Sequence, residues 1–226
     1  MLDPSSERDR LISAALSLAA ERPWSKITLA DIAERAGCTL VQLKAHFSSK
    51  GEILAAFSRL VDNEVLQRAP RRTDGQSPRD ALFEVVMCRL DVLEPYKSAL
   101  KSILDSGLPE PALLGRLFAA QGWMLEAAGI NSSGIDGGLR AAGLATVYAS
   151  VMRTWLEDDD PGHARTMAAL DRRLRRGQRT LERIEEVCSG LSRLGTGIAD
   201  VMRRPWRRSS APPPTDAAPT PPASSA

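Results

Sequence analysis

The sequence predicts an all-α protein, and three observations lead to this prediction. Apolar residues recur at steps of three and four along most of the chain, which is the period of an amphipathic helix. No stretch alternates apolar and polar residues with the period of two that a half-buried strand requires. Hydrophobic residues make up 43% of the 226 residues but aromatic residues only 4%. The core must therefore be rich in Leu and Ala, and both residues favour helices.

The first sixty residues predict four helices. An apolar stripe from Leu11 to Ala19 marks the first, residues 29–36 and 40–47 form two short helices, and a stripe from Ile53 to Val61 marks the fourth. The last three are each preceded by a hydroxyl residue with an acid or amide three positions later, the pattern of a capping box. These pairs are Thr28 with Asp31, Thr39 with Gln42, and Ser49 with Glu52.

The two short helices predict a helix-turn-helix. Gly37 stands where helix 29–36 must end, and glycine readily adopts the left-handed conformation of a helix C-terminus. The three-residue turn Gly37-Cys38-Thr39 then leads into helix 40–47. A short turn that contains glycine is typical of this motif. Ala33 and Ala36 are small enough to let the two helices cross closely.

Further helices are predicted over residues 78–93, 96–105, 111–128 and 137–157, and from residue 161 onward, with Asp160 as the cap before Pro161. Residues 69–78 are rich in turn formers and join two units. Residues 209–226 contain six of the fifteen prolines and predict disorder. We therefore expect a three-helix helix-turn-helix domain over 1–56, a helical ligand-binding and dimerisation bundle over 57–206, and a disordered tail over 207–226.

The net charge of +2 is unevenly distributed. Residues 1–60 carry net +1, residues 61–170 net −4, and residues 171–208 net +6. A partner attracted by positive charge is therefore expected at the two ends of the chain rather than in the middle.

The order of side chains in the first unit resembles the DNA-binding domain of TetR-family repressors. The similarity covers roughly residues 8–56 and rests on the run from Ile32 to Gly37, on Leu43, on His46-Phe47 and on Ser49-Lys50. It implies a homodimer that places residues 40–47 in the major groove of double-stranded DNA. We expect Gln42 to contact an adenine edge and Lys44 and Lys50 to contact phosphates. His46 is expected either to contact a phosphate or to form an interhelical hydrogen bond. The expected DNA-binding set is Thr28, Thr39, Gln42, Lys44, His46 and Lys50.

The second unit resembles the C-terminal domain of COQ9 proteins over about residues 137–176. The similarity rests on Ala141–Tyr148, Trp155–Asp159, Thr166-Met167 and Leu170–Leu174. It implies an alternative function, that of a lipid-binding accessory protein of ubiquinone biosynthesis that has lost DNA binding. Under either function a small apolar ligand or lipid is the expected effector, because pockets form between the helices of bundles. The candidate pocket residues are Met87, Leu90, Trp123, Met124, Tyr148, Met152 and Trp155. For any one of them, packing in the core is the favoured interpretation, and some of them are expected to line the pocket.

Residues 171–206 combine an apolar stripe with nine arginines and end in Trp206. Such a segment suits contact with an anionic membrane surface. The alternative, which we favour slightly, is a helix that packs in the core or at a dimer interface.

Other classes of function are not supported by any motif. The three cysteines are scattered, the two histidines are far apart, and neither phosphate loops nor hydrolase motifs occur. We therefore expect no enzyme activity, no metal and no cofactor. Met1-Leu2-Asp3-Pro4 has no signal-peptide character and no apolar run reaches 18 residues, so we expect a cytoplasmic protein. The favoured function is that of a ligand-controlled, dimeric regulator of transcription.

Overall fold

The computed structural model of this protein describes residues 2–107 and 111–177. Within these residues the chain is helical and contains no strand, which confirms the predicted fold class. The predicted tail over 207–226, and the basic apolar stripe beyond residue 177, lie outside the described residues.

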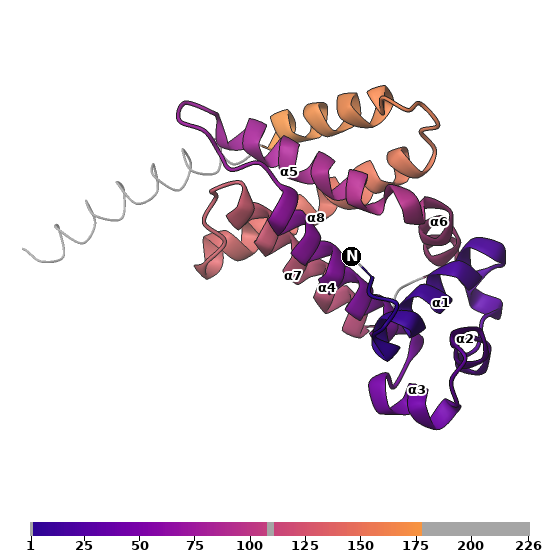
Figure 1. Ribbon diagram of the computed structural model, residues 1–226. Coiled ribbons are helices and arrows are strands. Elements are labelled where there is room, and N and C mark those ends of the chain that lie inside the picture. The colour runs from indigo at the N-terminus through magenta and orange to yellow at the C-terminus, as the bar shows by residue number, and fades with distance from the viewer. Residues whose placement is uncertain (1, 108–110, 178–226) are drawn as a thin grey trace, which may run out of the picture. The chain divides into compact units, whose positions relative to one another are not determined.

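The first unit contains the four predicted helices. They are α1 (Glu7–Glu21), α2 (Leu29–Ala36), α3 (Leu40–His46) and α4 (Lys50–Arg68), with a short 3₁₀ helix, η1 (Trp24–Lys26), between α1 and α2. Figure 1 shows α2 and α3 beside α1 and the start of α4. Their core is built from fully buried aliphatic and aromatic side chains: Leu11, Ile12, Ile27, Ile32, Leu43, Phe47 and Ile53.

The second unit begins with α5 (Pro78–Leu93), η2 (Glu94–Tyr96) and α6 (Lys97–Asp105). It continues with α7 (Pro111–Ala127), α8 (Gly134–Leu156) and a helix over residues 164–177. The last helix begins later than predicted. Pro161 and Gly162 form a turn, and the carboxylate of Asp160 accepts a hydrogen bond from the Ala164 N–H at 3.0 Å. Asp160 therefore precedes the helix by a turn instead of standing directly before it.

Helix α4 belongs to the first unit and also packs against helices of the second. It packs against α1 in the first unit and against α5 and α7 in the second, while α6 packs against α1. The predicted domain boundary at residue 56 consequently falls inside a continuous helix. Helices α4 and α6 thus both contact α1, against which α2 of the helix-turn-helix also packs.

A buried polar cluster lies where α4, α5 and α8 meet. The guanidinium of Arg89 forms an ion pair with Asp62 at 2.5 Å and donates from Nε to the Tyr148 hydroxyl at 3.2 Å. Arg89 and Asp62 are only 3% and 6% exposed. Burial of two charges is costly in free energy, so each depends on its partner. The Oδ2 atom of Asp62 is also buried and has no hydrogen-bond partner among the described residues.

Candidate nucleic-acid interface

Two capping boxes and a glycine fix the backbone of the helix-turn-helix. At α2 the Thr28 hydroxyl accepts from the Asp31 N–H at 3.2 Å, and the Asp31 carboxylate accepts from the Thr28 N–H at 2.7 Å. At α3 the Thr39 hydroxyl accepts from the Gln42 N–H at 3.3 Å, and Gln42 Oε1 accepts from the Thr39 N–H at 2.8 Å. These bonds satisfy N–H groups that a helix N-terminus leaves free.

Gly37 ends α2 as predicted, in the left-handed conformation with φ 68° and ψ 36°. Its N–H donates to the Glu34 carbonyl, and the Cys38 N–H donates to the Ala33 carbonyl. Residues with a side chain rarely adopt this conformation, so glycine at this position fixes the angle at which the chain leaves α2 and enters α3.

The inner side of α3 is anchored to α1. Leu43 and Phe47 are buried, and the guanidinium of Arg8 lies over the Phe47 ring at 5.5 Å. His46 Nε2 lies 3.2 Å from a carboxylate oxygen of Glu7. Of the two roles considered for His46, the structure thus contains the interhelical contact.

The outer side of α3 faces solvent. Leu40 and Val41 are 53% and 80% exposed, and Gln42 and Lys44 are also exposed. No described segment covers this surface. The outer side of α3 is therefore accessible to a groove of duplex DNA. The predicted insertion of residues 40–47 into the major groove requires this accessibility.

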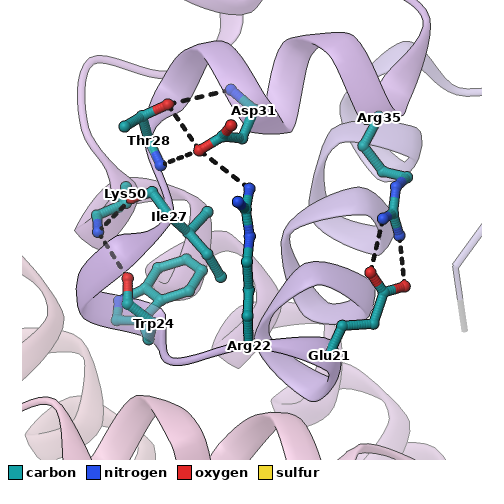
Figure 2. A network of polar contacts seen from close by, with 8 residues as sticks. All are labelled: Glu21, Arg22, Trp24, Ile27, Thr28, Asp31, Arg35 and Lys50. Carbon is teal, nitrogen blue, oxygen red and sulfur yellow. Dashed lines mark hydrogen bonds and ion pairs between the residues drawn. The ribbon is translucent and has the colours of Figure 1, made fainter.

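The other helix of the motif, α2, is fixed to the end of α1 by two ion pairs, which Figure 2 shows. Arg22 contacts the Asp31 carboxylate at 3.0 Å, and Arg35 forms a bidentate pair with Glu21, with both contacts at 2.7 Å. The Thr28 backbone and side-chain hydrogen bonds, together with Arg22, lower the pKa of Asp31 to about 2. The carboxylate that caps α2 therefore stays ionised well into the acid range.

Lys50, predicted to contact a phosphate, has its ammonium group inside the first unit. Nζ donates to the carbonyl of Trp24 at 3.0 Å and to that of Ile27 at 2.8 Å, as Figure 2 shows. The same Nζ lies 4.8 Å from the centroid of the Trp24 ring. Two backbone acceptors and an aromatic face thus hold this cation.

The remaining predicted DNA-binding residues differ in their availability. Lys44 is exposed and forms none of the ion pairs found among the described residues. The amide oxygen of Gln42 is used by the cap, and a bidentate contact with adenine needs both the oxygen and the nitrogen of the amide. The hydroxyls of Thr28 and Thr39 likewise serve their capping boxes.

The predicted pocket residues differ in how deeply they are buried. Leu90, Met124, Tyr148, Met152 and Trp155 are buried, Met87 is half-buried, and Trp123 is 52% exposed on α7. A hollow of about 460 Å³ lies between the start of α5 and helix 164–177. Its lining includes Phe83, Met167 and Leu174. A second, of about 340 Å³, lies between the end of α1 and α6. None of the seven predicted residues lines either of these two.

Sequence reasoning missed the contacts that hold the scaffold. Asp62 and Arg89 are charged residues on the buried faces of their helices, with Val61, Val65, Val86 and Leu90 as buried neighbours. Opposite charges at core positions of two helices are the signal that could have indicated the pair. The contacts of Lys50 join residues 26 and 23 positions apart and leave no such local signal.

Two other kinds of site are not found among the described residues. No three His, Cys, Asp or Glu side chains are grouped so that they could hold a metal ion. In the part of the chain that the structure describes, no helix is both long enough and apolar enough to span a membrane.

Comparison with known proteins agrees with both resemblances. Residues 11–57 match the family model described as bacterial regulatory proteins of the tetR family. Residues 114–180 match the COQ9 family model, a longer segment than the sequence analysis indicated.

Two known proteins are each similar to most of this chain. The chain is 25% identical over 176 residues to the mitochondrial ubiquinone biosynthesis protein COQ9 of Drosophila melanogaster, covering 74% of this chain but only 54% of that protein. It is 29% identical over 171 residues to the HTH-type transcriptional activator FasR of Mycolicibacterium smegmatis, covering 71% of this chain and 77% of FasR.

Solved structures show the same fold. A TetR transcriptional regulator from Nitrosomonas europaea superposes with a TM-score of 0.59 at 23% identity, covering 76% of this chain and 98% of that one. A TetR transcriptional regulator from Rhodococcus sp. RHA1 gives 0.59 at 19% identity, covering 77% and 97%. This chain therefore has a TetR-like fold, in which a tetR-type helix-turn-helix is followed by a segment similar to COQ9.

Proposed function

We propose that this protein is a dimeric, DNA-binding regulator of transcription whose affinity for its operator is controlled by a small apolar ligand. The observation that carries this proposal is the outer surface of α3, which is exposed and is held by a glycine turn and capping boxes. A rigid short helix that projects from a folded scaffold can enter the major groove. The match of residues 11–57 to the tetR model supports the same function.

Binding would depend on few charges. The first sixty residues carry net +1, whereas phosphate contacts supply much of the affinity of DNA-binding proteins. Two copies of the motif in a homodimer would double the number of contacts and set the spacing of two half-sites. Exposed apolar side chains suited to contact between two copies occur on α7, on α8 and on the last described helix: Leu114, Phe118, Trp123, Ile135, Leu139 and Met167.

Lys44 is the side chain whose removal tests a direct phosphate contact. The purified chain is used to select ligands from a pool of duplexes with a randomised centre, and the affinity for the selected duplex is then measured between about 50 and 200 mM salt. Lys44→Ala is expected to weaken binding and to reduce the salt slope by about one per copy. Lys101→Ala, an exposed lysine on α6, is the matched control and should leave the slope unchanged. Failure of the wild-type chain to enrich any duplex would contradict the proposal.

Control by a ligand requires that the ligand bind one conformation better than the other. The connection of α4 to both units gives a ligand in the second unit a route to α3. Release of the selected duplex by an apolar effector, with a matching loss of effector affinity in the presence of DNA, would establish the coupling.

The second candidate function is a COQ9-like lipid-binding accessory role without DNA binding. The match of residues 114–180 to the COQ9 model favours it. Flotation of the full chain with anionic liposomes, compared with a chain that ends at residue 177, separates the two functions. Flotation of the full chain alone, together with no enrichment of any duplex, would support the lipid-binding role over the regulator.

A further inference from the structure

The ammonium group of Lys50 has a defined place in the structure. It lies at the first position of α4 and donates to the Trp24 and Ile27 carbonyls, at 3.0 Å and 2.8 Å. Both acceptors belong to the segment that connects α1 to α2, and Ile27 directly precedes the N-cap of α2, Thr28. Lys50 therefore joins the start of α4 to the start of α2.

From this geometry, and resting on the proposed function, we infer that Lys50 is a positioning residue for DNA binding and does not contact a phosphate. A lysine ammonium has three N–H donors, and two are directed at carbonyl oxygens of the protein itself. The indole ring of buried Trp24 lies against the same cation. A phosphate would have to compete with these interactions for the same ammonium group.

The effect on DNA binding would be transmitted through α2. The Trp24–Ile27 segment is followed directly by Thr28, and the capping box of Thr28 with Asp31 begins α2. Helix α2 in turn sets the position of α3 through the turn at Gly37. The same segment is held from the other side by α6, where the Ser102 hydroxyl accepts from the Trp24 N–H at 3.0 Å and donates to the Arg22 carbonyl at 3.1 Å. Loss of the Lys50 contacts would remove the hydrogen bonds that tie this segment to α4 and leave those that tie it to α6.

Two substitutions separate positioning from phosphate contact. Lys50→Met keeps an unbranched chain over Trp24 but removes the charge and the donors. Lys50→Arg keeps the charge, and a guanidinium is an excellent phosphate ligand, but its planar fork does not reproduce the directions of the ammonium donors. Positioning predicts that both variants bind the selected duplex roughly tenfold more weakly, the change expected for one charge-assisted hydrogen bond. A phosphate contact predicts that Lys50→Arg binds as wild type.

The salt dependence gives the second readout. For Lys50→Met, positioning predicts weaker binding with a change in salt slope less than half of that caused by Lys44→Ala. A slope reduced as much as in Lys44→Ala would overturn the inference. So would an unchanged affinity with only a lower melting temperature, because Lys50 would then serve stability alone. If Lys50→Met does not fold, the affinity of Lys50→Arg decides.

Amide hydrogen exchange makes the inference testable apart from the proposed function. The hydrogen-bonded amides of Thr28, Asp31 and Ile32 at the start of α2 should exchange roughly tenfold faster in Lys50→Met than in wild type, and should be unchanged in Lys44→Ala. Unchanged exchange in Lys50→Met would overturn the positioning role. If wild type binds no duplex but the exchange result is as expected, the regulator function fails and the connection between α4 and α2 stands.

Discussion

At the scale of single residues, several charged side chains of the described part of the chain hold helices and turns together. Arg22 and Arg35 tie α2 to the end of α1, Lys50 holds the segment between these two helices, and Arg89 lies in the core beside Asp62. The sequence-based assignment of Lys50 to DNA rested on residue type and on its place at a helix start. The sequence does not show that the fold brings two backbone carbonyls within 3.0 Å of the ammonium group.

The buried pair of Asp62 and Arg89 predicts a large loss of stability when one partner is removed. Asp62→Ala leaves an unpaired guanidinium in the core and should lower the free energy of unfolding by about 3–5 kcal/mol. Urea denaturation followed by circular dichroism measures this change. Asp171→Ala, which breaks the exposed pair with Arg175, is the control and should cost less than about 1 kcal/mol. Similar losses in both variants would show that the buried pair has no special weight.

The depressed pKa of Asp31 predicts a pH-dependent contribution to stability. The pKa of Asp31 is about 2 in the folded protein, against an ordinary value of 3.8. The carboxylate therefore stabilises the fold at pH values above 3.8, and this contribution is lost as the pH falls from 3.8 to about 2. The melting temperatures of wild type and Asp31→Asn should therefore differ at about pH 5 and converge near pH 2. A difference that stayed constant over this range would mean that the carboxylate charge is irrelevant to the cap.

At the scale of elements, local signals predicted the helix-turn-helix well. Residues 29–36 and 40–46 are helical, Gly37 is left-handed, and the first two capping boxes are formed as predicted. At the third, the Ser49 hydroxyl accepts from the Glu52 N–H, and the Glu52 carboxylate accepts from the Ser48 N–H at 2.7 Å. The predicted start of helix 164–177 was wrong by three residues, because a turn at Pro161-Gly162 precedes this helix. Caps and glycine turns act over four residues and can be found in a sequence.

Two glycines in different conformations give a paired prediction. Gly37 has φ 68°, and a Cβ there would meet no atom within 4 Å, so Gly37→Ala carries only a conformational cost of about 1–2 kcal/mol. Gly143 lies within α8, with an equally open surrounding, and Gly143→Ala should stabilise by up to about 1 kcal/mol. Thermal unfolding of both variants tests these opposite signs. Equal shifts in one direction would contradict the argument from backbone conformation.

At the scale of the whole molecule, the sequence predicted the helical composition of the second unit but not how its side chains are placed. Met, Trp and Tyr at helical spacing suited either a pocket or a core. The structure buries Trp155 and Met124 and exposes Trp123, a difference set by how α7 and α8 pack. Such packing depends on contacts between distant segments, which a single sequence does not reveal.

Self-association can be tested on α8. Leu139 is 53% exposed, so Leu139→Glu should leave the fold intact. If this part of α8 lies at the contact between two copies, the substitution should raise the dimer dissociation constant at least tenfold, because it buries an unpaired charge. Sedimentation equilibrium of wild type and variant measures this. A variant that remained as dimeric as wild type would exclude this part of α8 from the interface.

The most direct test of the central claim is a substitution on the outer side of α3. Val41 is 80% exposed, so Val41→Glu should change the melting temperature little while placing a negative charge against the DNA. The salt-dependent affinity for the selected duplex is compared with that of Leu66→Glu, an equivalent substitution at an exposed position of α4. Loss of binding in Val41→Glu alone is the predicted result. Binding by Val41→Glu as tight as by wild type would contradict the account that α3 is the surface through which this protein binds DNA.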